Sequence, residues 1–213
     1  MYSNQKAGAF AAFINAIVAI LTIYVVVVMI GLDVLTDQDL FVEIAINNPT
    51  SLIFQSVLKF ISAACWVVLL VTLFKLLHNE AMVRMKFATL FGFLSILLLL
   101  TNAILSLIAI TQAAELTAVK YENANDLNRI IGILGMATIF TNGLWYLLTS
   151  WTALKSNQLP KRLNYIGLAI GAISIVPILG TFALLLSIVW FIWLASVLFK
   201  KASVPTNTWR STN

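Results

Sequence analysis

Long unbroken stretches of apolar residues are the feature that most restricts how this chain can fold. Four of them occupy residues 8–32, 52–77, 87–111 and 130–154, and each exceeds the roughly 20 residues that an α-helix needs to cross a bilayer. A helix satisfies its own backbone hydrogen bonds, so it is the form such a stretch takes in hydrocarbon. Because 61% of the residues are hydrophobic, no water-soluble fold of this length buries them all. Four transmembrane helices are therefore predicted.

A fifth apolar stretch, residues 163–199, is too long to be one transmembrane helix. As a single helix it would be about 55 Å long, far more than the hydrocarbon thickness. Pro177 removes a backbone donor, Gly180 suits a helix C-terminus and Thr181 suits an N-cap. We therefore predict a tight turn here between two short spans, 163–178 and 181–199. The alternative is one span followed by an interfacial or re-entrant segment.

The distribution of charge predicts the orientation, because cytoplasmic loops retain Lys and Arg during insertion. With six spans and the N-terminus inside, ten of the thirteen basic residues fall on the cytoplasmic side. Seven of the eight acidic residues fall on the outer side. The basic residues left outside are Lys59, Lys120 and Arg129. Both termini are therefore predicted to be cytoplasmic.

These features together predict an all-α, polytopic bundle of six transmembrane helices that forms a single transmembrane domain over residues 1–213. In the first outer loop, Leu40, Phe41 and Ile44 have helical spacing, which predicts a short amphipathic helix on the outer surface. Aromatic residues near the predicted inner helix ends are typical of an interfacial belt: Trp151, Tyr165, Trp190 and Trp193.

The predicted spans hold no Asp, Glu or His near their middle, and this argues against several functions. Intramembrane ionisable groups are the usual parts of proton relays and ion-coupled carriers. A single histidine, His78, and a single cysteine, Cys65, do not build a metal centre, so no metal and no cofactor are expected. No basic face with interleaved aromatics is present, so nucleic acid is not an expected partner.

Lys59 is the exceptional charge, because it lies several residues inside the second predicted span. One interpretation is that its aliphatic stem extends toward the outer head groups. The other is that it faces the bundle, where it binds an anionic head group or pairs with an outer-loop acid such as Glu43 or Glu115.

Asn102 and Asn142 belong to two successive predicted helices that are antiparallel neighbours. Counting from the helix ends places them within roughly 5 Å in depth. A buried amide in hydrocarbon needs a partner, so an interhelical hydrogen bond between them is predicted. The alternative is a polar pocket or substrate pathway lined by these two asparagines with Thr101 and Thr141. Asn15 is expected nearer the inner surface, where it serves packing.

Gly167 and Gly171 form a small-xxx-small pair in the fifth predicted helix. This spacing is typical of close helix packing in membranes. The pair is therefore a candidate packing surface, either within this chain or against another subunit.

Four segments and one glycine carry a resemblance to a known family: residues 5–10, 159–162, 165–167 and 189–194, with Gly171. On these features the chain resembles a bacterial family of small polytopic membrane proteins that is known only as a domain of unknown function. The resemblance extends loosely over the whole chain. It implies six helices and a multi-pass location in the bacterial cytoplasmic membrane, and it supplies neither an activity nor catalytic residues.

Three functions remain open from the sequence. The favoured one is a non-enzymatic subunit or accessory protein of a membrane complex, whose partners are membrane lipids and other subunits or further copies of itself. The second is a facilitator or carrier of a neutral or lipid-like molecule past Asn102 and Asn142. The third is a lipid-modifying enzyme that works near Lys59 or His78. The ligand, the partner and the oligomeric state are not predicted.

Overall fold

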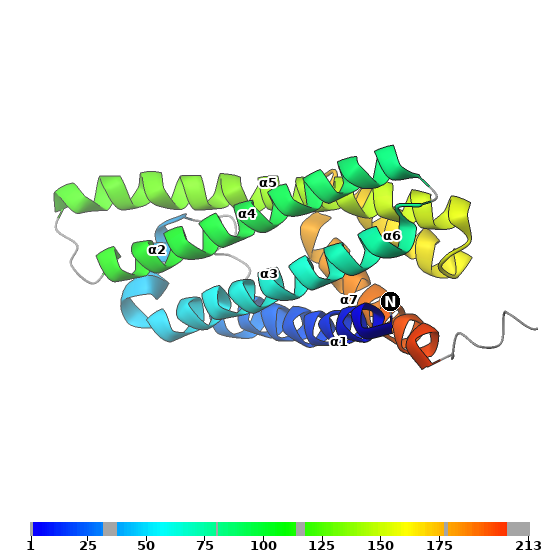
Figure 1. The fold of residues 1–213 in the computed structure, drawn as a ribbon. Helices are drawn as coiled ribbons and strands as arrows, with labels where there is room; N and C mark the ends of the chain where they lie inside the picture. The colour runs from blue at the N-terminus through cyan, green and yellow to red at the C-terminus, as the bar shows by residue number, and fades with distance from the viewer. Residues whose placement is uncertain (1, 32–37, 80, 114–117, 177–178, 204–213) are drawn as a thin grey trace, which may run out of the picture.

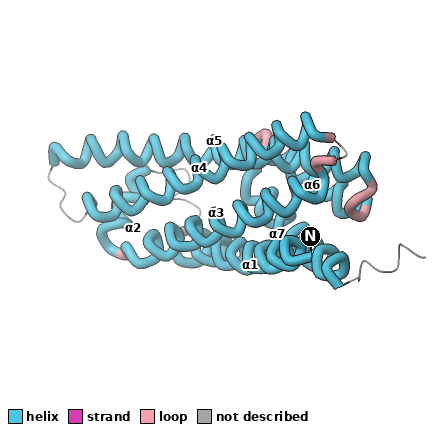
Figure 2. The backbone as a smooth tube through the Cα atoms, in the orientation of Figure 1, coloured by secondary structure: helices cyan, strands magenta, loops and turns pink. Residues whose placement is uncertain are grey.

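The computed structural model describes residues 2–31, 38–79, 81–113, 118–176 and 179–203. Within these ranges the regular structure is entirely helical, and short loops join the helices (Figure 2). The elements are α1 (Tyr2–Tyr24), the π-helix η1 (Val25–Ile30), α2 (Gln38–Asn47), α3 (Pro49–Leu77), α4 (Met82–Ala113), α5 (Ala118–Ser156), α6 (Lys161–Ser174) and α7 (Gly180–Ser203). The predicted all-α fold class is confirmed.

Five of the described helices are long and apolar enough to cross a membrane. They cover Asn4–Ile30, Pro49–Leu77, Met82–Gln112, Asp126–Ser156 and Gly180–Ser203. The fifth predicted span, 163–178, corresponds to α6, which has only 14 residues and a length of about 21 Å at helical rise. A polytopic membrane protein is therefore supported, whereas six full-length spans are not confirmed.

The predicted break in the last apolar stretch is present. Helix α6 ends at Ser174, and the backbone N–H groups of Ile175 and Val176 donate to Ala172 and Ile173 in tighter, 3₁₀-type bonds. Helix α7 begins at Gly180, so this glycine starts a helix and does not end one as predicted. Pro177 itself lies outside the described residues.

Six helices form a closed ring, in which each helix contacts the next in the order α1, α3, α4, α5, α6, α7 and α1 again. The N-terminus and the last turn of α7 lie at the same end of this bundle, which we call the terminal end (Figure 1). Helix α2 lies near the opposite end, the α2 end, where it contacts α3, α4 and α5. The helix predicted in the first outer loop is thus present, and it packs against the bundle.

The α6–α7 hairpin accompanies only the terminal half of α5. A Cβ added at Gly180 would lie 2.8 Å from the Cδ1 atom of Ile139, which is near the middle of α5. At the other end, the Lys201 ammonium donates to Gln158 Oε1 at 3.3 Å, just beyond the end of α5. The ring is therefore closed in the terminal half of the bundle and lacks α6 and α7 in the other half. Figure 1 shows the orange start of α7 near the middle of the bundle axis.

Aromatic side chains from three helices fill the centre of the terminal half. Trp66 of α3, Trp145 and Tyr146 of α5, and Trp190 and Phe191 of α7 pack edge to face, with ring centroids 4.5 to 6.0 Å apart. The prediction that Trp190 belongs to an interfacial belt is wrong, because its side chain is only 1% exposed. Trp151 and Tyr165 are largely exposed, as such a belt requires.

Small residues bring α5 and α6 into close contact. A Cβ at Gly171 would lie 2.8 Å from the Gly143 carbonyl oxygen, and a Cβ at Gly167 would overlap the Ser150 hydroxyl. The small-xxx-small pair therefore packs against α5 of the same chain.

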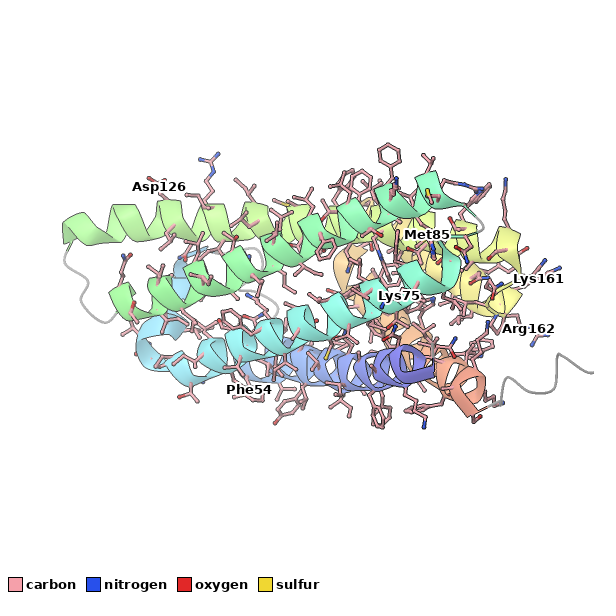
Figure 3. All side chains as sticks on the ribbon, viewed as in Figure 1. Phe54, Lys75, Met85, Asp126, Lys161 and Arg162 are labelled. Carbon is pink, nitrogen blue, oxygen red and sulfur yellow. The ribbon has the colours of Figure 1, made fainter. Side chains whose placement is uncertain are left out.

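The outer surface of the bundle is apolar along its length, and charged side chains lie toward its ends. Large hydrophobic residues are exposed on each of the long helices, including Phe13, Val57, Leu97, Ile133 and Phe182. Lys161 and Arg162 project at the terminal end, and Asp126 lies toward the other end (Figure 3). This distribution is the one a bilayer selects.

Candidate functional site

Lys59 of α3 lies between helices, with its ammonium group on neutral oxygen atoms. Its Nζ donates to Asn102 Oδ1 at 2.7 Å and, more weakly, to Ser106 Oγ at 3.5 Å. Both acceptors belong to α4 and are buried. Lys59 is ten residues into α3, or about 15 Å from its first residue at helical rise. The bundle-facing interpretation of Lys59 therefore matches its geometry.

An acidic partner for Lys59 is not present among the residues whose side chains are described. Among the described side chains, the Lys59 ammonium forms hydrogen bonds with Asn102 and Ser106. Glu43, one of the expected partners, is exposed. Glu115, the other, lies outside the described residues.

Asn102 links three helices. Besides accepting from Lys59, it donates through Nδ2 to the Ile131 carbonyl oxygen of α5 at 2.7 Å. Gly135 follows one turn later on the same side of α5, and a Cβ added there would lie 3.7 Å from Asn102 Nδ2, an ordinary contact distance. The amide thereby orients its oxygen toward α3, where the ammonium lies.

A second polar contact joins α1 and α3 next to Lys59. Ser62, one turn after Lys59, donates its hydroxyl to Asn15 Oδ1 at 3.0 Å. The Asn15 side chain is 2% exposed, and its Nδ2 has no partner within the described part of the chain. Asn15 thus packs between helices, as expected, and it also presents an unused amide donor.

Asn128 of α5 supplies another unused amide. Its side chain is 9% exposed, and neither its Nδ2 nor its Oδ1 has a partner in the described residues. It precedes Ile131 by three residues, so both lie on the α5 face that contacts α4. Helices α4 and α5 run in opposite directions, so one turn back from Ile131 corresponds to one turn forward from Asn102. Asn128 therefore lies at the level of Ser106.

These contacts define what we call the polar belt: Asn15, Lys59, Ser62, Asn102, Ser106 and Asn128. The belt crosses four helices at a similar depth. Its unused capacity consists mainly of N–H donors, from Asn15, Asn128 and the third ammonium hydrogen of Lys59. A donor-rich group that carries one positive charge suits an anionic oxygen ligand, a carboxylate or a phosphate.

The structure does not bring Asn102 and Asn142 together. Ser95 of α4 donates to the Thr138 carbonyl oxygen and Asn102 to that of Ile131, which fixes the register of the two helices. In this register Asn142 lies about three turns of α5 from the level of Asn102. The expected hydrogen bond between the two asparagines is therefore absent.

Thr101 and Thr141 also do not join the belt. The exposed Thr101 hydroxyl donates to the Leu97 carbonyl oxygen, and the buried Thr141 hydroxyl donates to those of Ala137 and Thr138. Each threonine thus bonds within its own helix. The four residues proposed as a pathway do not form one continuous lining.

An apolar cluster covers the polar belt toward the α2 end. Ala45, Leu52 and Ile110 are buried together there, and Ile44 and Leu107 pack against them. In the other direction lies the aromatic core of the closed ring. The belt is thus separated from both ends of the bundle by packed side chains.

Among the side chains that the structure describes, no group of three or more His, Cys, Asp or Glu residues is placed to hold a metal ion. His78, the residue considered for lipid chemistry, stacks on Phe74 at the terminal end. It lies about five turns of α3 away from Lys59.

Sequence reasoning missed Ser62, Ser106 and Asn128 as members of the site. A usable signal existed for two of them, because Ser62 and Ser106 follow Lys59 and Asn102 by three and four residues, the spacing of one helix face. Asn128 carried no such signal, since it precedes the apolar stretch and is indistinguishable there from a loop residue.

A family model described as domain of unknown function (DUF4386) matches residues 10–205. No curated protein and no solved structure matches the chain significantly.

Proposed function

This chain belongs to the DUF4386 family, whose description assigns no activity, and we propose that it binds a small anionic oxygen group inside the bilayer, at the polar belt. The observation that carries the proposal is the hydrogen bonding of Lys59. Its ammonium lies on two neutral oxygens, Asn102 Oδ1 and Ser106 Oγ, among the described residues. A cation inside a helical bundle is costly unless a partner neutralises it. A bound carboxylate or phosphate supplies that partner.

The direction of the hydrogen bonds supports binding over catalysis. Lys59 donates to Ser106 Oγ, and the Ser106 hydroxyl donates to the backbone carbonyl oxygen of Asn102. An activated serine would instead donate its proton toward the base. The proposal is therefore a non-enzymatic binding protein or carrier, closest to the second function that the sequence left open.

The accessory-subunit function loses one of its supports. Gly167 and Gly171, the small residues proposed as a contact surface, are occupied by α5 of the same chain. Further subunits or copies of the chain, like the surrounding lipids, remain partners for the apolar outer surface.

The proposed topology places the terminal end of the bundle in the cytoplasm of a bacterium and the α2 end outside. Its support is the charge distribution, since the helix ends at the terminal end carry Lys75, Lys86, Lys155, Lys161 and Arg162. The α6–α7 hairpin then enters from the cytoplasmic side and returns to it.

A protease test checks this topology. With a cleavable tag fused to either terminus, protease added to intact spheroplasts is expected to leave the tag uncut, because the terminus is inside. Permeabilising the spheroplasts should make both tags cleavable. Cleavage of either tag in intact spheroplasts would contradict the topology.

The proposed function predicts that inorganic phosphate stabilises the purified protein in a non-ionic detergent. A ligand that binds only the folded state raises the midpoint of thermal unfolding as its concentration increases. Sodium chloride should hold the ionic strength constant, so that screening is not mistaken for binding. Lys59→Met keeps an apolar chain of similar length and removes the charge, so its unfolding midpoint is expected to be insensitive to phosphate.

The two asparagines provide a matched pair for this measurement. Asn102→Leu removes the acceptor that holds the ammonium, and its phosphate response is expected to disappear. Asn142→Leu makes the same chemical change on the neighbouring helix, away from the belt, and should keep the response. A phosphate response that persists in Lys59→Met would contradict binding at the polar belt. An unsubstituted protein that responds neither to phosphate nor to an anionic lipid would rule out the proposed function.

A further inference from the structure

One half of α5 lacks the neighbours that cover the other half. Of residues 141–153, eight are buried, and α6 lies along this part of the helix. None of residues 129–140 is buried. The α6–α7 hairpin ends at the level of Ile139, so the face of α5 that it covers on the terminal side continues uncovered beyond it. We call residues 129–140 the bare half of α5.

Gly132 lies on this uncovered face. It precedes Ile139 by seven residues and Gly143 by eleven, and both separations return to nearly the same side of a helix. Because Ile139 lies against α7 and Gly143 against α6, Gly132 is on the side of α5 that the hairpin covers further along. A Cβ added at Gly132 would meet no atom within 4 Å. Met136, one turn further along the same face, is 51% exposed.

The bare half of α5 borders the polar belt directly. Gly135 stands between this face and Asn102, and the nearest atom to its added Cβ would be Asn102 Nδ2 at 3.7 Å. With glycine at both positions 132 and 135, no side chain of α5 at these two positions screens Asn102 and Lys59 from the uncovered face. The side of the bundle is thus the direction in which the belt is least covered.

The other directions are filled by packed residues. Ala45, Leu52 and Ile110 pack together on the α2 side of the belt. Trp66, Trp145 and Trp190 fill the closed ring on the terminal side. A ligand that reaches Lys59 from either aqueous phase would have to displace one of these clusters, whereas a ligand in the bilayer would not.

We propose that the ligand is a membrane lipid with an anionic head group, which enters sideways from the leaflet at the α2 end. This inference rests on the proposed function and deepens it. The head group pairs with Lys59 and the unused amides of Asn15 and Asn128, and the acyl chains lie along the bare half of α5. Charge selects the head group, and the apolar surface of Ile133 and Met136 accommodates the chains.

The test compares a head group with and without its chains on the purified full-length protein in a non-ionic detergent. The probes are glycerol 3-phosphate, dioctanoyl phosphatidic acid and, as the zwitterionic control, dioctanoyl phosphatidylcholine. Because acyl chains add apolar contact, dioctanoyl phosphatidic acid is expected to bind about tenfold or more tightly than glycerol 3-phosphate. The phosphatidylcholine should bind more weakly than the phosphatidic acid, because its quaternary ammonium repels Lys59.

Variants in the bare half of α5, with a control on α4, locate the acyl chains. Gly132→Trp places a large side chain in open space on the bare face, and Met136→Trp does so one turn further along. Both are expected to lose the advantage of the lipid over glycerol 3-phosphate and to keep the response to glycerol 3-phosphate. Leu97→Trp, at an exposed position of α4 outside the bare half of α5, should behave as the unsubstituted protein.

The outcomes separate the two proposals. Equal affinity for glycerol 3-phosphate and dioctanoyl phosphatidic acid would overturn the lipid inference and leave a soluble anion as the ligand. Unchanged lipid affinity in both Gly132→Trp and Met136→Trp would overturn it as well. No response to glycerol 3-phosphate, inorganic phosphate or the anionic lipid would overturn the proposed function itself.

Discussion

Replacing Trp145 by alanine is expected to lower the free energy of unfolding by about 3–5 kcal/mol, the range for a fully buried aromatic residue. Trp145 is 1% exposed, and its ring contacts those of Trp66, Tyr146 and Trp190 at centroid distances of 4.5, 5.0 and 6.0 Å. The side chain therefore connects α3, α5 and α7. Its loss leaves a cavity at the point where the ring of helices is closed.

The physical cause of this loss differs from that in a water-soluble protein. Lipid chains are as apolar as the protein core, so burial between helices gains little from the hydrophobic effect. What Trp145→Ala removes is dispersion contact and edge-to-face geometry in a closely packed centre. Unfolding of the purified protein in mixed micelles by increasing sodium dodecyl sulfate measures the effect.

Trp151 provides the matched control for this substitution. It lies on the same helix but is 49% exposed. Trp151→Ala is expected to cost less than about 1 kcal/mol, as exposed substitutions usually do. Similar losses for the two variants would show that the aromatic cluster does not hold the helices together.

Alanine substitutions at Gly171 and Gly132 are expected to change stability in opposite directions. At Gly171 the new methyl group would lie 2.6 Å from Leu147 Cγ and 2.8 Å from the Gly143 carbonyl oxygen. The carbonyl belongs to the backbone of α5 and cannot rotate away, so α6 must move outward. Overpacking of this kind costs about 1–3 kcal/mol.

At Gly132 the same methyl group enters open space. Alanine is a better helix former than glycine by up to about 1 kcal/mol, so Gly132→Ala is expected to be neutral or stabilising. The same unfolding assay in micelles measures both variants. Destabilisation by Gly132→Ala as large as that by Gly171→Ala would mean that another element covers this face of α5 and would argue against the bare half as a lipid surface.

Much of the fold follows from local properties of the chain. The long apolar stretches form helices because hydrocarbon leaves the backbone no other partner, and this requirement acts on each stretch separately. The break in the last stretch was also predictable, because Pro177 cannot donate a backbone hydrogen bond and one helix of that length would exceed the bilayer thickness. In the structure the helix before this break ends at Ser174 and the next begins at Gly180.

The candidate site was predictable only in part. Lys59 and Asn102 were recognised because charged and amide side chains are rare inside apolar stretches. The contact between Lys59 and Asn102 is not predicted, because counting residues from the helix ends pairs Asn102 with Asn142. The count took residue 130 as the start of the helix that carries Asn142, whereas α5 begins at Ala118, so it placed Asn142 too near the level of Asn102.

The sequence alone determined that this is a membrane protein, which stretches are helical and which end of the bundle is basic. Each of these three properties depends on the solvent and on residues that are near in the chain. Only the tertiary structure decided that Trp190 lies in the core, that Asn128 is buried at the level of Ser106 and that the α6–α7 hairpin stops midway along α5. In a helix that is apolar all round, no hydrophobic face marks the side that meets a neighbour. The rotation and depth of each helix are set by packing with the others, and these decide whether a polar residue faces a partner or the lipid.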